Sequence, residues 1–249
     1  MRTMRVFRLL LSVALVACGR GTPPVPPAPE VLLTRARTQF RAGDFAEAQQ
    51  SLRRVIFELS PNDSTLPEVH YLLAETQFQV GQYSEASVSF RQVADQFPGS
   101  VYAPLALLRA GDANMRLWRK PELDPTYGQT ALAIYQDLVG RYPDSQAATR
   151  AQLHVRQLRE WFADKTYKNG LFYFRRRAYD SGIIYFKDVV ANYPDTPRAA
   201  DALLRLADSY RVIGYREELR ETCAHVRRFY PQVPGLERSC PPDSGVGAR

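Results

Sequence analysis

The chain has 249 residues, of which 45% are hydrophobic and 24% charged, a composition that supports a globular core of about 200 residues. Apart from one apolar run near the N-terminus, the sequence has no long apolar run, which excludes a spanning helix in the rest of the chain. Arg2, Arg5 and Arg8 carry three of the seven net positive charges, and the +4 that remains is a weak indication of acidic partners and none of nucleic acid.

The N-terminus has the layout of a secretory signal. The three arginines precede an apolar run, Leu9 to Ala17, that is too short to remain as a spanning helix. The four residues Leu15-Val16-Ala17-Cys18 resemble a bacterial lipobox, in which cleavage just before the cysteine leaves a lipid-modified thiol. We therefore predict a signal peptide over residues 1–17 and lipidation of Cys18. An ordinary signal peptide with an incidental cysteine is the alternative.

A proline-rich stretch follows this cysteine. Gly19 is not aspartate, and this resembles the sorting signal for the outer membrane rather than the inner membrane. Residues from Gly19 to Glu30 include five prolines and lack apolar periodicity, which is typical of a stiff, polyproline-like tether. Residues 18–30 are thus predicted to hold a folded body on a lipid anchor at the periplasmic face of the outer membrane.

Aromatic residues followed directly by proline recur along the chain. The four pairs, with Pro61 as a fainter fifth mark, place prolines 37, 45, 51 and 37 residues apart, and each proline lies 15 or 16 residues after another aromatic residue. Proline lacks an N–H and restricts the residue before it, so each pair predicts the end of a helix in an array of helical repeats. The pairs are Phe97-Pro98, Tyr142-Pro143, Tyr193-Pro194 and Tyr230-Pro231, and the aromatic residues in phase with them are Phe45, Tyr83, Tyr127, Tyr179 and Tyr215.

The second block fits the tetratricopeptide repeat (TPR) best. Gly81 permits the turn between two helices, and Ala86 keeps the side chain small where the helices cross. We predict an all-α TPR superhelix of about five helix-turn-helix units over residues 31–231, with a lengthened turn before Tyr127 and a long connecting helix before Tyr179. The alternative is a generic helical bundle whose Tyr-Pro pairs are coincidental helix ends.

Two further cysteines, Cys223 and Cys240, lie near the C-terminus. An oxidising compartment permits a disulfide between them. Cys223 also occupies a buried helix position at which a small apolar residue suffices, so the sequence leaves both interpretations open. Residues 232–249 are rich in proline and glycine and are predicted to be disordered when free.

No arrangement of residues for catalysis is visible in the sequence. His70, His154 and His225 lie in different units, and there is no Cys-x-x-Cys, Gly-rich phosphate loop or nucleophile elbow. We therefore expect no enzyme activity, no metal and no cofactor. A binding function is therefore the class we favour, because stacked repeats form a concave surface from the first helix of each unit.

Concave positions can be named in the first two units, where aromatic residues alternate with charged ones. Such a surface suits an extended peptide, because rings hold apolar side chains while charges set the register. The alternative is that Phe40 and Phe78 seal the contact between adjacent units. The predicted groove residues are Leu33, Arg37, Phe40 and Arg41 in the first unit and Tyr71, Glu75, Phe78 and Gln79 in the second.

A second candidate surface lies at the turn of the fourth unit, where three consecutive arginines have tyrosines close in sequence. Arginine with tyrosine is typical of a protein–protein interface. Three arginines at a helix end also complement the helix dipole and solvate the turn, which is the alternative. The predicted interface residues are Tyr173, Arg175, Arg176, Arg177, Tyr179 and Tyr185.

Two tyrosine-proline stretches and the long connection between them carry a resemblance to a known family. The stretch from Asp124-Pro125-Thr126-Tyr127 through Tyr142-Pro143-Asp144-Ser145 to Tyr193-Pro194-Asp195-Thr196-Pro197 resembles the BamD family, the lipoproteins of the outer-membrane β-barrel assembly machinery. The order of lipobox cysteine, short linker and five repeats agrees with that family. Two departures are Gly182-Ile183-Ile184-Tyr185, where a basic residue is expected, and Thr166 to Lys168, which replaces a more acidic stretch.

The resemblance implies a non-enzymatic scaffold. Its implied partners are the periplasmic domains of the barrel-forming assembly protein, contacted chiefly through the C-terminal repeats, and unfolded outer-membrane proteins, received by the N-terminal repeats. Other assembly lipoproteins are further implied partners. Alternative functions are coordination of peptidoglycan synthesis or cell division, which usually goes with a coiled coil before the repeats, and pilus assembly, which needs more uniform repeats.

Overall fold

The computed structural model describes residues 28–118, 120 and 124–242, and no strand occurs among them. Ten helices form five consecutive hairpins in this part of the chain, and one short helix follows. The hairpins are α1 (Pro29–Ala42) with α2 (Phe45–Glu58), α3 (Leu66–Gln79) with α4 (Tyr83–Gln96), α5 (Tyr102–Leu117) with α6 (Thr126–Arg141), α7 (Gln146–Arg175) with α8 (Tyr179–Asn192), and α9 (Pro197–Ile213) with α10 (Arg216–Phe229); the short helix is α11 (Leu236–Ser239).

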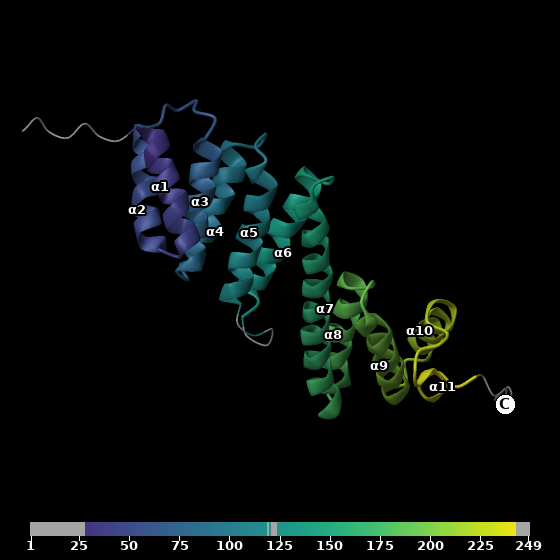
Figure 1. The fold of residues 1–249 in the computed structure, drawn as a ribbon. Coiled ribbons are helices and arrows are strands. Elements are labelled where there is room, and N and C mark those ends of the chain that lie inside the picture. Colours follow the sequence, from purple (N-terminus) through teal and green to yellow (C-terminus); the bar gives the residue numbers. More distant parts are fainter. Residues whose placement is uncertain (1–27, 119, 121–123, 243–249) are drawn as a thin grey trace, which may run out of the picture.

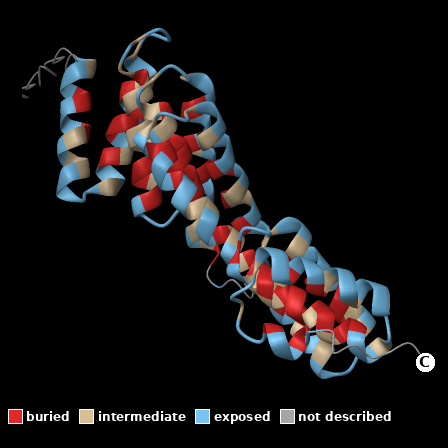
Figure 2. Ribbon diagram, turned by 90° about the vertical axis from the view of Figure 1, so that its right-hand side faces the viewer, coloured by how far each residue is buried: buried red, intermediate tan, exposed pale blue. Residues whose placement is uncertain are grey.

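The hairpins stack in chain order into an elongated solenoid, with α1 at one end and α10 and α11 at the other (Figure 1). Each helix packs against its neighbour in sequence, and α3, α5, α7 and α9 also contact one another in succession. Buried residues follow the long axis of the molecule (Figure 2). The prediction of an all-helical TPR superhelix with five units is confirmed.

The aromatic-proline pairs end the second helix of units two to five, as predicted. The aromatic residue is the C-cap in each case, with φ between −128° and −134°, because the ring of the following proline excludes the α conformation. Two of these tyrosines also link the end of their own repeat to the end of the preceding one by a hydrogen bond. The Tyr142 hydroxyl donates to the Pro98 carbonyl at 3.0 Å, and the Tyr230 hydroxyl donates to the Pro194 carbonyl at 3.2 Å. The four caps are Phe97, Tyr142, Tyr193 and Tyr230.

The unequal repeat lengths have two structural causes. Helix α7 is 30 residues long, and its two halves belong to different core clusters, so the predicted long helix before Tyr179 is confirmed. The predicted long turn before Tyr127 separates Leu117, at the end of α5, from Thr126, at the start of α6. Residues 119 and 121–123 in this turn lie outside the described residues.

Two glycines let consecutive helices approach closely. A Cβ atom at Gly111 would lie 2.3 Å from the ring of Tyr135, and one at Gly170 would lie 2.6 Å from the ring of Phe186. Both rings are fully buried. Because protein interiors are close-packed, these contacts determine how α5 meets α6 and how α7 meets α8.

Two predicted boundaries are wrong. The predicted tether ends at residue 30, but α1 begins at Pro29, since proline is well suited to the first helical turn, where its missing N–H costs no hydrogen bond. The predicted disordered tail begins at residue 232, but α11 packs against α9 and α10, and Leu236 and Cys240 are buried. These apolar side chains cover the end of the solenoid. Residues 243–249 lie outside the described residues.

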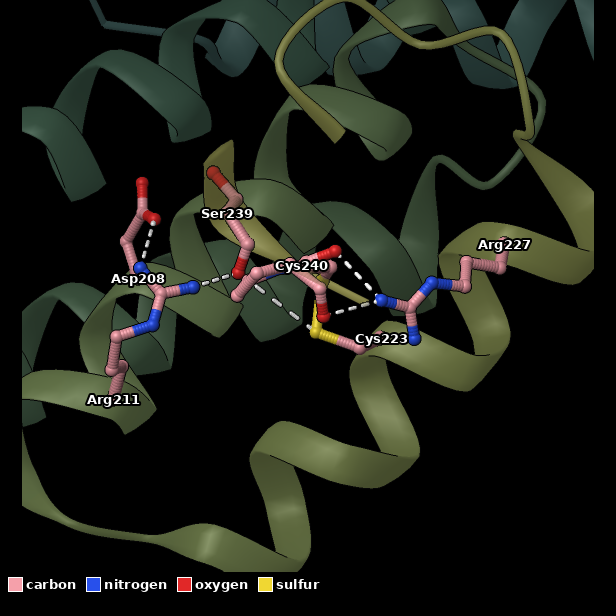
Figure 3. The surroundings of a disulfide bond; sticks show 7 residues. Asp208, Arg211, Cys223, Arg227, Ser239 and Cys240 are labelled. Carbon is pink, nitrogen blue, oxygen red and sulfur yellow. Dashed lines mark hydrogen bonds and ion pairs between the residues drawn. A yellow bond between two sulfur atoms is a disulfide. The ribbon is translucent and has the colours of Figure 1, made fainter. Parts of the chain in front are cut away.

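A disulfide joins Cys223 in α10 to Cys240, directly after α11 (Figure 3). Its Sγ atoms are 2.04 Å apart, and the Cα atoms are separated by 5.4 Å. Cys223 is buried as well, so the packing interpretation and the disulfide interpretation both apply to it. The bond fastens the C-terminal segment to the last helical hairpin.

Candidate interaction surfaces

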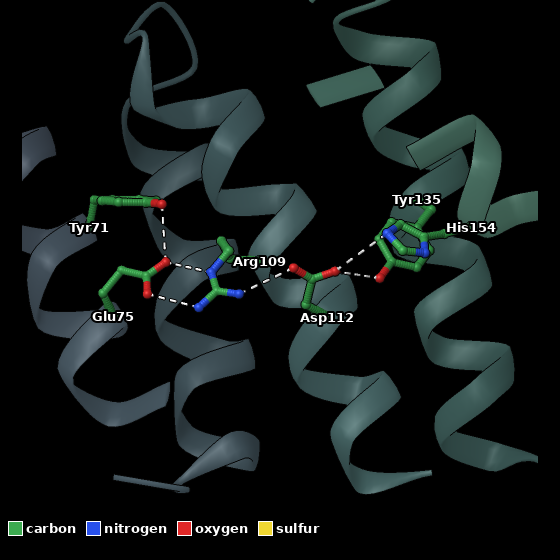
Figure 4. Close-up of polar contacts among 6 residues, drawn as sticks. All are labelled: Tyr71, Glu75, Arg109, Asp112, Tyr135 and His154. Atoms are coloured by element: carbon green, nitrogen blue, oxygen red, sulfur yellow. Dashed lines mark hydrogen bonds and ion pairs between the residues drawn. The ribbon is translucent and has the colours of Figure 1, made fainter. Parts of the chain in front are cut away.

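A chain of polar side chains crosses the solenoid from α3 to α7 (Figure 4). Arg109 in α5 donates to both carboxylate oxygens of Glu75 in α3, at 2.5 and 2.9 Å, and to Asp112 at 3.2 Å. The Asp112 carboxylate accepts a hydrogen bond of 2.8 Å from the Tyr135 hydroxyl in α6, and His154 Nε2 in α7 lies 3.9 Å from it. Units two, three and four are therefore tied together by one network.

Burial makes this network costly to break. Glu75 is only 7% exposed, and its carboxylate also accepts a hydrogen bond of 3.1 Å from the Tyr71 hydroxyl. Burial raises the pKa of Tyr71 and of Tyr135, so both phenols stay protonated and donate. Although burial opposes its charge, Arg109 has a raised pKa because of its hydrogen bonds to Glu75. Each charge in the network is stabilised by its partner, as a buried charge requires.

Three of the predicted groove residues are buried. Leu33 belongs to the core cluster that α1, α2 and α3 form together. The ring of Phe78 packs edge-on against Tyr83 at 5.1 Å and lies 3.8 Å beneath the guanidinium of Arg109. Glu75 is enclosed by the network above. Neighbouring helices thus cover these three side chains. For Phe78 the structure favours the alternative that its ring seals the contact between adjacent units.

The other five groove residues reach the surface to different degrees. Arg37 donates to the two carboxylate oxygens of Glu68 in α3, at 2.7 and 2.6 Å, so part of its hydrogen-bonding capacity is used within the protein. Phe40 packs edge-on against Phe45 at 5.5 Å. A peptide groove stays a prediction, now limited to the accessible residues. Arg41 and Gln79 are exposed, and Arg37, Phe40 and Tyr71 are half-buried.

The partners of the charged inner-face residues were not among the predicted residues. Arg109 lies 34 residues after Glu75, and Arg198 lies 34 residues after Asp164, with which it also forms an ion pair. Stacked repeats bring equivalent positions of successive units to the same face. Opposite charges one repeat apart are therefore a signal in the sequence that could have identified these pairs.

Aromatic and arginine side chains, some exposed and some half-buried, gather where α7 meets α8. The ring of Tyr173 stacks on Tyr185 with centroids 5.4 Å apart, and the Arg176 guanidinium lies 3.6 Å from the ring centroid of Phe172. Phe172 also contacts Tyr173 edge-on at 5.2 Å, which joins the two stacks. We call this group the aromatic-arginine surface; it consists of Phe172, Tyr173, Arg175, Arg176, Arg177 and Tyr185.

This surface differs from the predicted interface at two residues. Tyr179 packs edge-on against Phe174 at 5.4 Å and is half-buried, so it stabilises the turn between α7 and α8. Phe172 was not among the predicted residues, yet it is 50% exposed. Its aromatic character is visible in the sequence, but its exposure depends on which face of α7 the neighbouring helices cover. The three arginines are exposed, and their place in an interface stays a prediction.

Residues 28–118, 120 and 124–242 offer neither a metal centre nor a membrane-spanning helix. No group of three histidine, cysteine, aspartate or glutamate side chains lies close enough to hold a metal ion in these ranges. Within the same part of the chain, no helix combines the length and the apolar character that crossing a membrane requires. Cys18, the predicted lipidation site, lies outside it.

Solved structures with a similar outline are TPR proteins. TTC0263, a thermophilic TPR protein from Thermus thermophilus, aligns with 85% of this chain and 97% of its own at 22% identity and a TM-score of 0.39. The TPR2AB domain of yeast Sti1 aligns with 85% of this chain and 81% of its own at 13% identity and a TM-score of 0.45. Both likenesses are too remote to bear on function.

Relatives named outer membrane protein assembly factor BamD align with part of the chain. The protein from Caulobacter vibrioides is 31% identical over 108 residues, which is 43% of this chain and 35% of the relative. The protein from Vibrio cholerae is 29% identical over 99 residues, which is 40% of this chain and 41% of the relative. The chain thus spans well under half the length of these relatives. The outer membrane lipoprotein family YfiO matches residues 27–226, and the chain belongs to this family.

Proposed function

We propose that this protein is a lipid-anchored, non-enzymatic scaffold that takes part in the assembly of β-barrel proteins in the outer membrane. The observation that carries the proposal is the match of residues 27–226 to a family of outer membrane lipoproteins. Its relatives bear the name of an outer membrane protein assembly factor. The fold suits a scaffold, because a solenoid offers separate surfaces to different partners along its length.

We assign the aromatic-arginine surface to the barrel-forming assembly protein, through the periplasmic domains of that partner. Tyrosine and arginine are enriched among the residues that dominate binding energy at protein interfaces. The stacking of Tyr173 on Tyr185 and of Arg176 on Phe172 restrains these side chains before binding. Less side-chain entropy is then lost on association, which favours affinity.

Co-purification from native membranes tests this assignment. We expect a chain that carries Phe172→Ala, Arg175→Gln and Arg176→Gln to recover at least tenfold less of a barrel protein with periplasmic domains than the unchanged chain. Loss of the stacked ring and of two charges removes both kinds of contact, while the helix C-terminus keeps its fold. Unchanged recovery would contradict the assignment of this surface.

A matched control lies on α2, at the N-terminal end of the solenoid. Three substitutions on α2 make the same chemical changes at exposed residues, and we expect full recovery of the partner. They are Arg53→Gln, Arg54→Gln and Phe57→Ala, with Phe57 87% exposed.

Separation of membrane and soluble fractions tests the lipid anchor. A chain with Cys18→Ser is expected to leave the membrane fraction if lipidation of this residue holds the protein there.

We assign unfolded outer-membrane proteins to the inner face of the N-terminal half, around exposed Arg41 and Gln79. A photo-crosslinking residue at position 79 is expected to form adducts with the C-terminal peptide of a barrel protein. The control position is Val88 in α4, which is 58% exposed and belongs to the second helix of its unit. Equal adducts at positions 79 and 88 would show that contact is not specific to the inner face.

A further inference from the structure

A cavity of about 320 Å³ lies between α10, the end of α9 and the segment after α11. Every charged side chain among the described residues that line it is an arginine, and the remaining lining is apolar. We call it the arginine pocket; Arg211, Arg216, Arg220 and Arg227 line it together with Leu219, Cys223 and Pro241.

Pro241 lines one wall of this pocket, and the residue before it, Cys240, is joined to Cys223 by the disulfide (Figure 3). Arg227 donates to the carbonyl oxygens of Cys240 and Pro241, each at 2.7 Å, and Arg211 donates to the carbonyl of Ser239. Together with the covalent bond from Cys223, these contacts hold Pro241 in place opposite α10. This wall is therefore held in place by two arginines and a disulfide.

The four arginines differ in how far their guanidinium groups are already hydrogen-bonded within the protein. Arg211 and Arg227 donate hydrogen bonds to backbone carbonyls, and the Arg211 guanidinium also lies 3.6 Å from the carboxylate of Asp208. Arg216 forms no ion pair or hydrogen bond with any described residue and is exposed. Arg220 pairs with Glu217 at 2.6 Å, yet its side chain is 68% exposed. Arg216 and Arg220 are thus the two guanidinium groups that an incoming anion can reach most directly.

The shape of the pocket indicates a ligand longer than a single ion. Arg216, Leu219, Arg220, Cys223 and Arg227 follow one stripe of α10, which spans about 16 Å at the rise of an α-helix. Along this stripe, guanidinium groups alternate with apolar side chains. Guanidinium groups bind carboxylates and phosphates through paired hydrogen bonds.

We propose that the arginine pocket binds an acidic peptide segment of a partner protein, with its carboxylates on Arg216 and Arg220 and an apolar side chain between Leu219 and Pro241. The position favours a protein ligand over a lipid headgroup, because α10 lies at the end of the solenoid farthest from α1, where the chain leads toward the predicted anchor (Figure 1). The inference stands apart from the proposed function, since it concerns the pocket's chemistry alone.

Fluorescence anisotropy with the purified chain tests the pocket. The probe is a labelled peptide of sequence Leu-Glu-Glu-Leu-Glu-Glu, and its twin carries glutamine at each glutamate. We expect the acidic probe to bind, and Arg216→Gln with Arg220→Gln to weaken binding at least tenfold. Arg53→Gln with Arg54→Gln removes the same charge from α2 and is expected to change the affinity less than twofold. Equal losses in both variants, or equal binding of the glutamine twin, would overturn the proposal.

A second variant distinguishes the contribution of the Pro241 wall to binding from that of the arginines. Cys223→Ala with Cys240→Ala keeps all four guanidinium groups but releases Pro241, and we expect at least fivefold weaker binding with circular dichroism unchanged. Vesicles with and without phosphatidylglycerol test the lipid alternative. If anionic vesicles bind through Arg216 and Arg220 while the acidic probe does not bind, the pocket recognises lipid and the proposal is wrong. Because the assay needs no assembly partner, its failure leaves the co-purification result unaffected.

Discussion

Arg109→Met is expected to lower the free energy of unfolding by about 3–5 kcal/mol, because it leaves the carboxylate of Glu75 buried without its charge partner. The same change removes the guanidinium that covers the ring of Phe78. Urea unfolding followed by circular dichroism at 222 nm measures the loss. Because units two to four share this network, we expect their helices to unfold first.

A double variant provides the control for Arg109. Glu75→Leu with Arg109→Met replaces both charges by apolar groups of similar length, and such replacements of buried pairs are often close to neutral. We expect it to recover most of the stability that Arg109→Met loses. If Arg109→Met alone costs less than about 1 kcal/mol, solvent reaches Glu75 well enough to stabilise its charge, and the network is not what ties the three units together.

Replacing Cys223 and Cys240 by alanine is expected to destabilise the C-terminal unit by about 3 kcal/mol, since the disulfide closes a loop of 17 residues in the unfolded chain. Hydrogen exchange is the appropriate measurement, because it reports each helix separately. We expect faster exchange in α10 and α11 and little change in α1 to α6, which contact only their neighbours in the solenoid.

Reductant supplies an internal control for this prediction. The unchanged protein in dithiothreitol should exchange like the alanine variant, and the alanine variant should not respond to dithiothreitol. If the oxidised and reduced proteins exchange at the same rate, burial of Leu236 and the arginine contacts to the backbone carbonyls of the C-terminal segment hold α11 without the covalent bond.

The ends of the second helices were predictable because the signal is local. A proline acts on the residue directly before it, so Tyr142 and Tyr193 leave the α conformation wherever the neighbouring units lie. Repetition of this signal revealed the number of units, and its unequal spacing revealed the 30-residue helix α7. These inferences need no knowledge of which helices touch.

The candidate surfaces were less predictable, because exposure depends on contacts between units. Phe78 and Phe40 have the same place in their repeats, but only Phe78 is covered by an arginine from the following unit. Phe172 is a large apolar residue, yet it lies half exposed beside Arg176. Residue type alone does not distinguish these cases.

By itself, the sequence determined that this protein is a helical array of five units and where most helices end, since helix breaking and amphipathic spacing operate within a few residues of the chain. Only the tertiary structure decided which charges pair across units, which aromatic rings remain at the surface, and that residues 232–242 are ordered. A proline- and glycine-rich composition indicates disorder until burial of Leu236 and the bond from Cys223 to Cys240 offset the entropy of ordering. Those contacts join residues that lie apart in the chain, so they exist only once the solenoid has formed.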